Sequence, residues 1–254
     1  MSDRHITPET KQAFDTDGFV YLSAFLDKNE TAELKSKLEH YVREVVPNVP
    51  PADKFYEDKA NNLTLKQLVR MDKHDDYFHD LCHGSRFEKL ASLLMGGEVV
   101  SKGVEYFNKP PKVGKATPPH QDGYYFMINP CEAVTIWLAL DDVDDENGCL
   151  RYVRGSHRQG LRAHRRTDTL GFSQGIGDYG DSDTAKEVKF HAHPGDALVH
   201  HSVTIHRADG NVSENRTRQA IGLVYYSAAA KEDRIAQRAY QEKLESELAA
   251  SGKI

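Results

Sequence analysis

The sequence has few of the features that assign a chain to a class at once. Its only cysteines, Cys82, Cys131 and Cys149, are too few and too widely spaced for a disulfide framework or a Cys-x-x-Cys zinc site. No stretch approaches the ~20 consecutive apolar residues of a membrane span, and the N-terminus lacks the apolar core of a signal peptide. We therefore expect reduced thiols, no membrane partner and a cytoplasmic protein.

Positive charge is not in excess either. The 33 Lys and Arg residues are outnumbered by 39 Asp and Glu, which gives a net charge of −6 and argues against a nucleic-acid partner. With 254 residues, the chain can bury a core without disulfides or a structural metal, so any metal is expected to be catalytic. Histidine is abundant by contrast: the chain has 13, roughly twice what average composition supplies.

Helical signals dominate the first 97 residues. Thr7 before Pro8 predicts a helix that Gly18 ends, and Asp27 with Glu30 predicts a capping box that opens a long amphipathic helix. A polar, Pro-rich stretch from residue 47 to about 63 follows, then weaker helical signals up to residue 79. Another capping box, beginning at Ser85, opens a helix that the glycines 96–97 end.

From residue 98 the pattern changes to short β-branched and aromatic runs separated by turn residues, without helices between them. This spacing predicts a jelly roll or barrel over 98–228, and a charged helix follows over 229–254. The expected strands include 99–108, 123–128, 133–140, 150–153, 187–192, 196–201 and 219–227. We expect one domain, in which 1–97 support the β core, and we expect 160–186 to be a long loop that covers or binds the substrate.

The sharpest local signal is the segment PPHQDGYYF. If it is an extended strand, His120 and Asp122 face one pocket while Gln121 points away. A histidine from a later strand, His206 in VTIHRADGN, would complete a set of two imidazoles and one carboxylate. Such a set leaves open positions on a six-coordinate ion and suits non-haem Fe(II) that activates dioxygen. By itself an HxD tripeptide is also compatible with coincidence in a chain rich in both residues.

Two arginines follow the distal histidine. Arg216 and Arg218 share strand parity with Ala220 and Gly222, whose small side chains would line a cavity. A guanidinium on the metal-facing side offers a planar fork to a carboxylate, which implies a co-substrate acid. The alternative is that both arginines pair with surface acids.

At this point the sequence resembles the phytanoyl-CoA dioxygenase family of Fe(II)/2-oxoglutarate oxygenases over nearly its whole length. The resemblance includes DGFVYLSAFLD at the N-terminus, the HxD motif, HPGDALVHH at 193–201 and HRADGNVSENRTRQA at 206–220. The most specific block is WLALDDVDDENGCLRYVRGSH, where the family's Asn-Gly-x-Leu-x-x-x-x-Gly-Ser-His run stands as Asn147, Gly148, Leu150, Gly155, Ser156 and His157.

The resemblance implies a double-stranded β-helix, cupin-like core and a set of roles. Iron would be held by His120, Asp122 and His206, and 2-oxoglutarate would be bound by its distal carboxylate at Arg218. Trp137 falls where relatives place a tryptophan beside the co-substrate, and a core aromatic is the alternative. Tyr106 and Asn108, in the strand before the HxD motif, occupy positions that often help to hold the co-substrate.

The sequence also departs from the family pattern. Many relatives carry a serine two residues after the distal histidine, where this chain has Ala208, and one extra residue precedes the arginine. Arg216 therefore competes with Arg218 as the carboxylate clamp. Because Asp122 is present, where related halogenases have a small residue, the resemblance implies hydroxylation or another oxidation, with release of succinate and CO2, and not halogenation.

Substrate signals are thin, and only a small molecule and dioxygen are implied as partners. Tyr124, Tyr125 and Phe126 are candidates for pocket walls or for the core. Arg162, His164, Arg165 and Arg166 form a basic cluster that indicates an anionic substrate or, alternatively, a solvated loop. Neither the substrate nor the oligomeric state follows from the sequence.

Two other functions fit parts of the pattern. A cupin-type metal protein would use His191 and His193, together with His200 or His201, and would need no 2-oxoglutarate. A sensor or binding module would keep the β fold without turnover.

Overall fold

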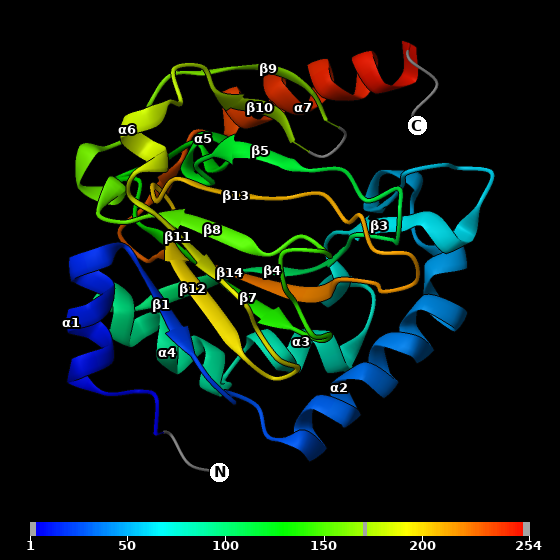
Figure 1. The fold of residues 1–254 in the computed structure, drawn as a ribbon, viewed down its shortest axis with the longest axis horizontal. Helices are drawn as coiled ribbons and strands as arrows, with labels where there is room; N and C mark the ends of the chain where they lie inside the picture. Colours follow the sequence, from blue (N-terminus) through cyan, green and yellow to red (C-terminus); the bar gives the residue numbers. More distant parts are fainter. Residues whose placement is uncertain (1–3, 170–171, 251–254) are drawn as a thin grey trace.

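Helices concentrate at the two ends of the chain and strands in its middle (Figure 1). The computed structural model describes residues 4–169 and 172–250. Its helices are α1 (Pro8–Asp17), α2 (Lys28–His40), α3 (Asp76–Cys82), α4 (Arg86–Met95), α5 (Gly123–Phe126), α6 (Asp181–Thr184) and α7 (Arg234–Ala250). Within the described ranges, no helix combines the length and the apolar character that crossing a membrane requires.

The strands form two main sheets and two short pairs. They are β1 (Phe19–Leu22), β2 (Lys54–Tyr56), β3 (Leu65–Leu68), β4 (Val99–Asn108), β5 (Thr117–His120), β6 (Ile128–Asn129), β7 (Ala133–Ala139), β8 (Leu150–Val153), β9 (His164–Thr169), β10 (Phe172–Ile176), β11 (Glu187–Phe190), β12 (Ala197–His201), β13 (His206–Ala208), β14 (Gln219–Ser227) and β15 (Lys231–Glu232). The larger sheet has the order β1-β12-β7-β14-β4-β3-β2, and the smaller one β11-β8-β13-β5.

The N-terminal helices begin where the sequence predicts, and α1 and α4 end at the predicted glycines, whereas the α-helical part of α2 ends at His40 and a π-helical turn over Tyr41–Val45 continues toward Pro47. Asp27 and Glu30 form the expected capping box of α2, and the Ser85 hydroxyl caps α4. Gly18 ends α1 in the left-handed conformation, with φ +85°. α3 and α4 then pack on the outer face of the larger sheet.

Two hydrophobic clusters hold the layers together. The first joins the helices to the outer face of the larger sheet through residues such as Leu34, Leu90 and Ile136. The second lies between the two sheets and includes Trp137 and Tyr152. Each fully buried large apolar side chain contributes roughly 1.5–3 kcal/mol to folding. The two antiparallel sheets, packed face to face, form the expected jelly roll with flanking helices.

The region before residue 97 contains more β structure than predicted. Residues 63–79 were expected to be weakly helical, but Leu65–Leu68 forms β3, which pairs with β4 and in turn with β2. The physical reason is tertiary: β3 satisfies the backbone groups along an edge of β4, which outweighs a weak local helical preference.

Two further predictions were wrong in the β region. Residues 123–128 were expected to be a strand, but the chain turns into α5, with the amides of Tyr125 and Phe126 bonded to the carbonyl of Asp122 at 2.9 and 3.1 Å. At Gly123 a Cβ would lie 2.4 Å from the sulfur of Cys131, so only glycine fits this turn. The expected loop 160–186 contains α6 and the hairpin β9–β10, apart from residues 170–171, which lie outside the described ranges.

Candidate metal centre and its two cavities

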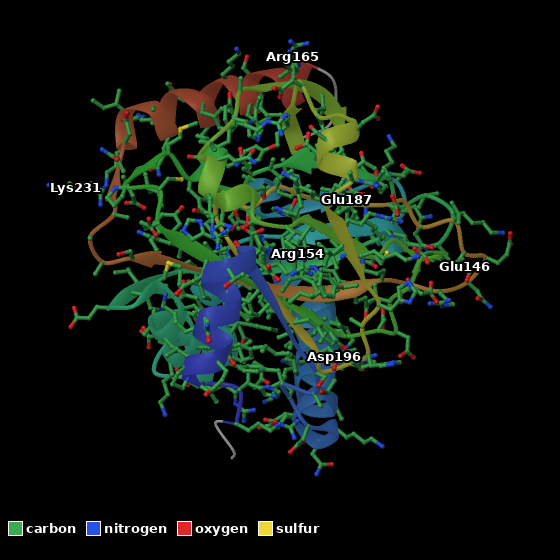
Figure 2. All side chains as sticks on the ribbon, turned by 60° about the vertical axis from the view of Figure 1, so that its left-hand side comes forward. Glu146, Arg154, Arg165, Glu187, Asp196 and Lys231 are labelled. Atoms are coloured by element: carbon green, nitrogen blue, oxygen red, sulfur yellow. The ribbon has the colours of Figure 1, made fainter. Side chains whose placement is uncertain are left out.

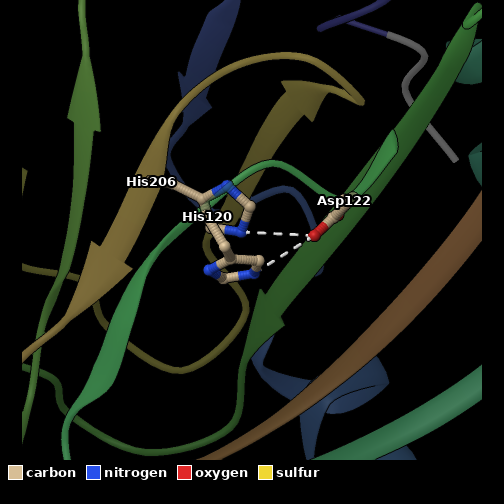
Figure 3. Close-up of side chains that lie close together, drawn as sticks. All are labelled: His120, Asp122 and His206. Atoms are coloured by element: carbon tan, nitrogen blue, oxygen red, sulfur yellow. Dashed lines mark ion pairs between the residues drawn. The ribbon is translucent and has the colours of Figure 1, made fainter. Parts of the chain in front are cut away.

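Two side chains from neighbouring strands and one from the turn that follows β5 converge at one point. β13 pairs with β5 so that His206 lies directly opposite His120, and their ring centroids are 4.1 Å apart. Nε2 of His120 lies 3.3 Å from Oδ1 of Asp122, and Nε2 of His206 lies 3.5 Å from the same oxygen (Figure 3). The structure thus brings together all three residues of the predicted iron site.

The carboxylate of Asp122 is directed toward the histidines by a turn, whereas the sequence predicted an extended strand with His120 and Asp122 on one face. β5 ends at His120, and Asp122 has the helical dihedral angles φ −58° and ψ −34° at the start of α5. The turn, and not an extended strand, directs its carboxylate toward the histidines. Gln121 points away, as expected: its side-chain nitrogen donates to the carbonyls of Gly160 and Val203 at 2.9 and 2.6 Å.

The two ligand histidines are held in the same tautomer. Nδ1 of His120 lies 2.9 Å from the carbonyl oxygen of Pro118, and Nδ1 of His206 lies 3.1 Å from that of Thr204. Since a carbonyl only accepts, each neutral ring donates through Nδ1 and keeps the lone pair on Nε2. The nitrogen suited to bind a metal therefore faces Asp122 in both rings.

The second oxygen of Asp122 is committed to other partners. The Thr135 hydroxyl donates to Oδ2 at 2.7 Å, and Nε2 of His200 lies 3.0 Å from it. Nδ1 of His200 lies 3.1 Å from the hydroxyl of Tyr152, which fixes the orientation of that ring. Oδ1 of Asp122 is thereby left for a metal. The sequence offered His200 only as a ligand of the cupin alternative and did not indicate this supporting role.

The charges of the cluster suit a divalent cation. Burial alone would raise the pKa of Asp122, but His206, His120 and His200 together hold that pKa well below its ordinary value. Burial lowers the pKa of His206 well below its ordinary value, and the neighbouring histidines add to this effect. One carboxylate and two imidazoles, with ligand atoms within 4.8 Å of one another, fit a non-haem iron(II) ion.

A small cavity of about 90 Å³ lies beside the three ligands, and Arg218 lines it. Arg218 is buried, its guanidinium carbon lies 5.5 Å from the ring centre of Trp137, and its Nε has no hydrogen-bond partner among the described residues. Burial lowers the pKa of Arg218 to about 10, so it stays charged at neutral pH. A buried cation without a partner anion is costly, so the site fits a carboxylate ligand.

Arg216 lies outside this cavity. Its guanidinium forms ion pairs with Asp144 at 2.8 Å and Glu146 at 3.0 Å, and Glu146 projects at the edge of the molecule in Figure 2. The sequence predicted that Arg216 lies on the same strand face as Ala220 and Gly222. This prediction was wrong, because β14 begins only at Gln219 and Arg216 belongs to the preceding loop.

The other residues expected near the co-substrate are divided between two places. Trp137 and Asn108 line the small cavity, and the side-chain oxygen of Asn108 is buried without a partner in the described structure. Tyr106 packs in the helix-covered core, where its hydroxyl accepts a hydrogen bond from Gln219 at 2.9 Å, and it lines neither cavity.

Two buried lysines in the small cavity were missed in the sequence. Nζ of Lys66 pairs with Glu57 at 3.0 Å, and Nζ of Lys109 donates to the carbonyl of Lys115 and to Thr117. Burial and the charge of Arg218 hold the pKa of Lys109 well below its ordinary value. The only sequence signal is a lysine inside the short run LTLKQL, and it becomes informative only when β3 is known to join the sheet.

The histidines of the cupin alternative do not meet at a site. His191 pairs with Asp145 at 3.1 Å and His193 pairs with Asp142 at 2.7 Å, and both rings are exposed. His201 contacts Glu132 at 3.1 Å. Only His200 approaches the metal centre, as a partner of Asp122.

A large cavity of about 540 Å³ adjoins the small one. Gln67, Phe107, Asp122 and Thr135 line both cavities and form the boundary between them. The other walls come from β2 and β3, from the inner face of β4 and β14, and from α5 and α7. These walls include Phe55, Arg70, Lys102, Gly103, Glu105, Tyr125, Phe126, Gly222, Val224, Tyr226, Gln237, Tyr240, Gln241 and Leu244.

Of the residues expected to contact the substrate, some of the aromatic ones line the large cavity and the basic ones do not. Tyr125 and Phe126 line the large cavity, whereas Tyr124 stacks on His164 with ring centroids 4.3 Å apart. The basic cluster at 162–166 lines neither cavity, and Arg162 is paired with Asp178 and Asp183, at 2.8 Å each. Its member Arg165 lies at the upper edge of the molecule in Figure 2.

A jelly roll that gathers two imidazoles and one carboxylate beside a buried, unpaired arginine defines an enzyme class, the iron(II)- and 2-oxoglutarate-dependent oxygenases. Within that class the chain belongs to the phytanoyl-CoA dioxygenase family (PhyH), whose sequence profile matches residues 14–220. The resemblance expected from the sequence is confirmed.

Similar proteins cover nearly the whole chain. A phytanoyl-CoA dioxygenase of Arabidopsis thaliana is 25% identical over 252 residues, which cover 86% of this chain and 88% of the relative. EvdO2 from Micromonospora carbonacea var. aurantiaca, solved with 2-oxoglutarate, is 27% identical with a TM-score of 0.69, and the match covers 90% and 93% of the two chains. The epimerase SnoN, solved with Fe³⁺, alpha-ketoglutarate and nogalamycin RO, shares the fold at 24% identity and a TM-score of 0.70, over 88% and 84%.

Proposed function

We propose that this protein uses iron(II), 2-oxoglutarate and dioxygen to oxidise an unactivated C–H bond of a small molecule, with hydroxylation as the outcome. The observation that carries the proposal is that one small cavity holds a three-ligand centre together with the buried guanidinium of Arg218, whose Nε has no hydrogen-bond partner in the described part of the chain. Among similar structures, SnoN is an epimerase and SnoK a carbocyclase, so product analysis is part of the test.

Each residue has a defined task in this proposal. His120, Asp122 and His206 hold the iron, while Thr135 and His200 keep the second oxygen of Asp122 away from it. Arg218 binds the distal carboxylate of 2-oxoglutarate and stacks on Trp137. Asn108 offers its unpaired side-chain oxygen to the same cavity.

When bound, iron(II) would supply the oxidising chemistry in which 2-oxoglutarate, dioxygen and the substrate R–H give succinate, CO2 and the alcohol R–OH, with one oxygen atom going to succinate and one to the alcohol. The protein positions the reactants and excludes water. The large cavity, which borders Asp122, receives the substrate.

We further propose that the chain is a single catalytic domain, in which 1–97 support the core, 98–228 carry the site and 229–254 form the C-terminal helical region, whose helix α7 lines the large cavity. The free cysteines Cys82, Cys131 and Cys149 support a reducing, cytoplasmic compartment.

The decisive experiment is an anaerobic titration of the protein with iron(II) and then 2-oxoglutarate, followed by visible absorption, and then succinate release in air. We expect a weak charge-transfer band that saturates at one equivalent, and slow succinate release even without substrate. The Arg216→Ala variant, altered only on the surface, serves as the matched positive control. A wild-type protein that gives neither the band nor succinate contradicts the oxygenase function and leaves the sensor alternative.

A further inference from the structure

The large cavity contains one carboxylate that the iron chemistry does not use. Glu105 lies on β4, on the same face as Phe107, and lines the cavity. Its Oε2 accepts one hydrogen bond, from the side-chain nitrogen of Gln67 at 3.1 Å. Across the described residues, no basic side chain forms an ion pair with Glu105.

The two basic side chains in the cavity wall already have partners. Arg70 forms an ion pair with Asp53. Lys102 pairs with Glu232 at 2.7 Å and lies 4.8 Å above the ring centre of Tyr226. Glu105 is therefore a carboxylate of this wall that has no ion-pair partner among the described residues.

The space beside Glu105 is kept open by a glycine. Gly222 of β14 is the cross-strand partner of Glu105, and both residues line the cavity. A Cβ at Gly222 would lie 2.7 Å from a ring carbon of Phe107, so a side chain there would displace that ring. The opening lets a ligand reach the carboxylate from the cavity.

The surrounding walls are aromatic. Phe55, Phe107, Tyr125, Tyr226 and Tyr240 all line the cavity. Aromatic faces attract organic cations, and the attraction increases in a site that excludes water. Burial raises the pKa of Glu105 to about 7, and the charges of Asp122 and Asp72 add to the shift, while Gln67 and the charge of Arg70 oppose it only in part.

We propose that Glu105 is the substrate-recognition residue and that the substrate is an organic ammonium compound, whose cationic nitrogen binds Glu105 and whose apolar part lies against the aromatic walls. A neutral hydroxyl could donate a hydrogen bond here but would leave the negative charge uncompensated. This inference rests on the proposed function in one respect, namely that the large cavity holds the substrate.

The test compares three probes with one skeleton and different head groups: phenethylamine, which is protonated at neutral pH, 2-phenylethanol and phenylacetate. Binding to the full chain is measured by calorimetry at about pH 8, where Glu105 is ionised. The variants are Glu105→Gln, which preserves shape and the contact with Gln67, and Glu98→Gln, which makes the same change at an exposed position just before β4.

We expect wild type and Glu98→Gln to bind the ammonium probe about ten- to a hundredfold more tightly than the alcohol, and Glu105→Gln to lose this preference. Circular dichroism and 2-oxoglutarate binding of Glu105→Gln should match wild type, which excludes misfolding. No cation preference in wild type, no measurable binding of the ammonium probe, or a preference that survives in Glu105→Gln would overturn the proposal.

The outcome is separable from that of the proposed function. If the protein is not an oxygenase, 2-oxoglutarate binding and succinate release are missing, while the preference for the ammonium probe and its dependence on Glu105 remain. If the protein is an oxygenase but its substrate is not an ammonium compound, 2-oxoglutarate binding and basal succinate release are normal, while the three probes bind with the same affinity.

Discussion

The small and the large cavity share a boundary but are built differently. The small cavity is lined mainly by strands of the two main sheets, and its polar groups are nearly all paired, with Arg218 Nε and Asn108 Oδ1 as exceptions. The large cavity takes seven of its 20 lining residues from the edge strand β2 and from the helices α5 and α7. The comparison teaches that the metal centre is built by the jelly roll alone, whereas the wall of the large cavity combines jelly-roll strands, which carry Glu105, with attached elements.

The largest effect should come from removing the shared carboxylate. Asp122→Ala takes away one of three ligands, so we expect iron affinity to fall by more than the roughly hundredfold typical of outer-sphere partners and succinate release to vanish. Iron titration and a succinate assay measure both quantities. His193→Ala is the control, because the cupin alternative predicts the reverse pattern for these two variants.

Arg218→Ala should damage the small cavity alone. Loss of a buried, charge-assisted contact predicts a rise of about a hundredfold in the KM for 2-oxoglutarate, with iron binding unchanged. Arg216→Ala should change the KM by less than about twofold, since exposed ion pairs contribute little. If Arg216→Ala gives the larger rise, the two arginines have been assigned the wrong way round.

His200→Ala tests whether the contact between His200 and Asp122 contributes to iron binding. The variant removes a hydrogen bond to Asp122, so iron should bind about ten- to a hundredfold more weakly while the KM for 2-oxoglutarate changes less. Metal titration provides the measurement. His201→Ala, at the next position and paired with Glu132, should leave the affinity at the wild-type level; an equal loss in both variants would assign the effect to the strand and not to the ring.

The smallest expected effect is that of Glu105→Gln on the free energy of unfolding. The pKa of Glu105 is raised from 4.5 to about 7 in the folded protein, so the unfolded chain ionises first as the pH rises. The folded state loses stability progressively between these values, and the loss is complete above pH 7. Allowing for partial solvent screening, glutamine should raise the unfolding free energy by about 1–2 kcal/mol at high pH.

Urea unfolding at a pH above 7 and at one below 4.5 checks this prediction. The gain should vanish at the lower pH, where both folded and unfolded chains are protonated. Glu98→Gln should be neutral at both values. A Glu105→Gln variant that is destabilised at high pH would show that the carboxylate already has a favourable partner in the folded protein.

Side chains could be placed from the sequence where a motif identifies them without knowledge of their tertiary neighbours. The convergence of His120, Asp122 and His206 could be predicted because their residue types and order restrict the chemistry, while their role as iron ligands stays a prediction. The turn at Asp122 was missed, since dihedral angles are set there by the packing of Gly123 against Cys131 and not by local propensity.

The residues that were missed depend on tertiary neighbours. Lys66 and Glu105 lie in alternating stretches that are equally compatible with solvent-facing strands. Their positions inside cavities follow only from the pairing of β3 with β4 and from the cover that α7 provides.

The boundary formed by Gln67, Phe107, Asp122 and Thr135 has a practical consequence for protein engineering. Exchanging the contacts of the C-terminal helix, at Tyr240, Gln241 and Leu244, alters the far wall of the large cavity and touches none of the iron ligands. A library confined to these positions could therefore retarget the catalyst to new compounds while its oxidising machinery stays intact.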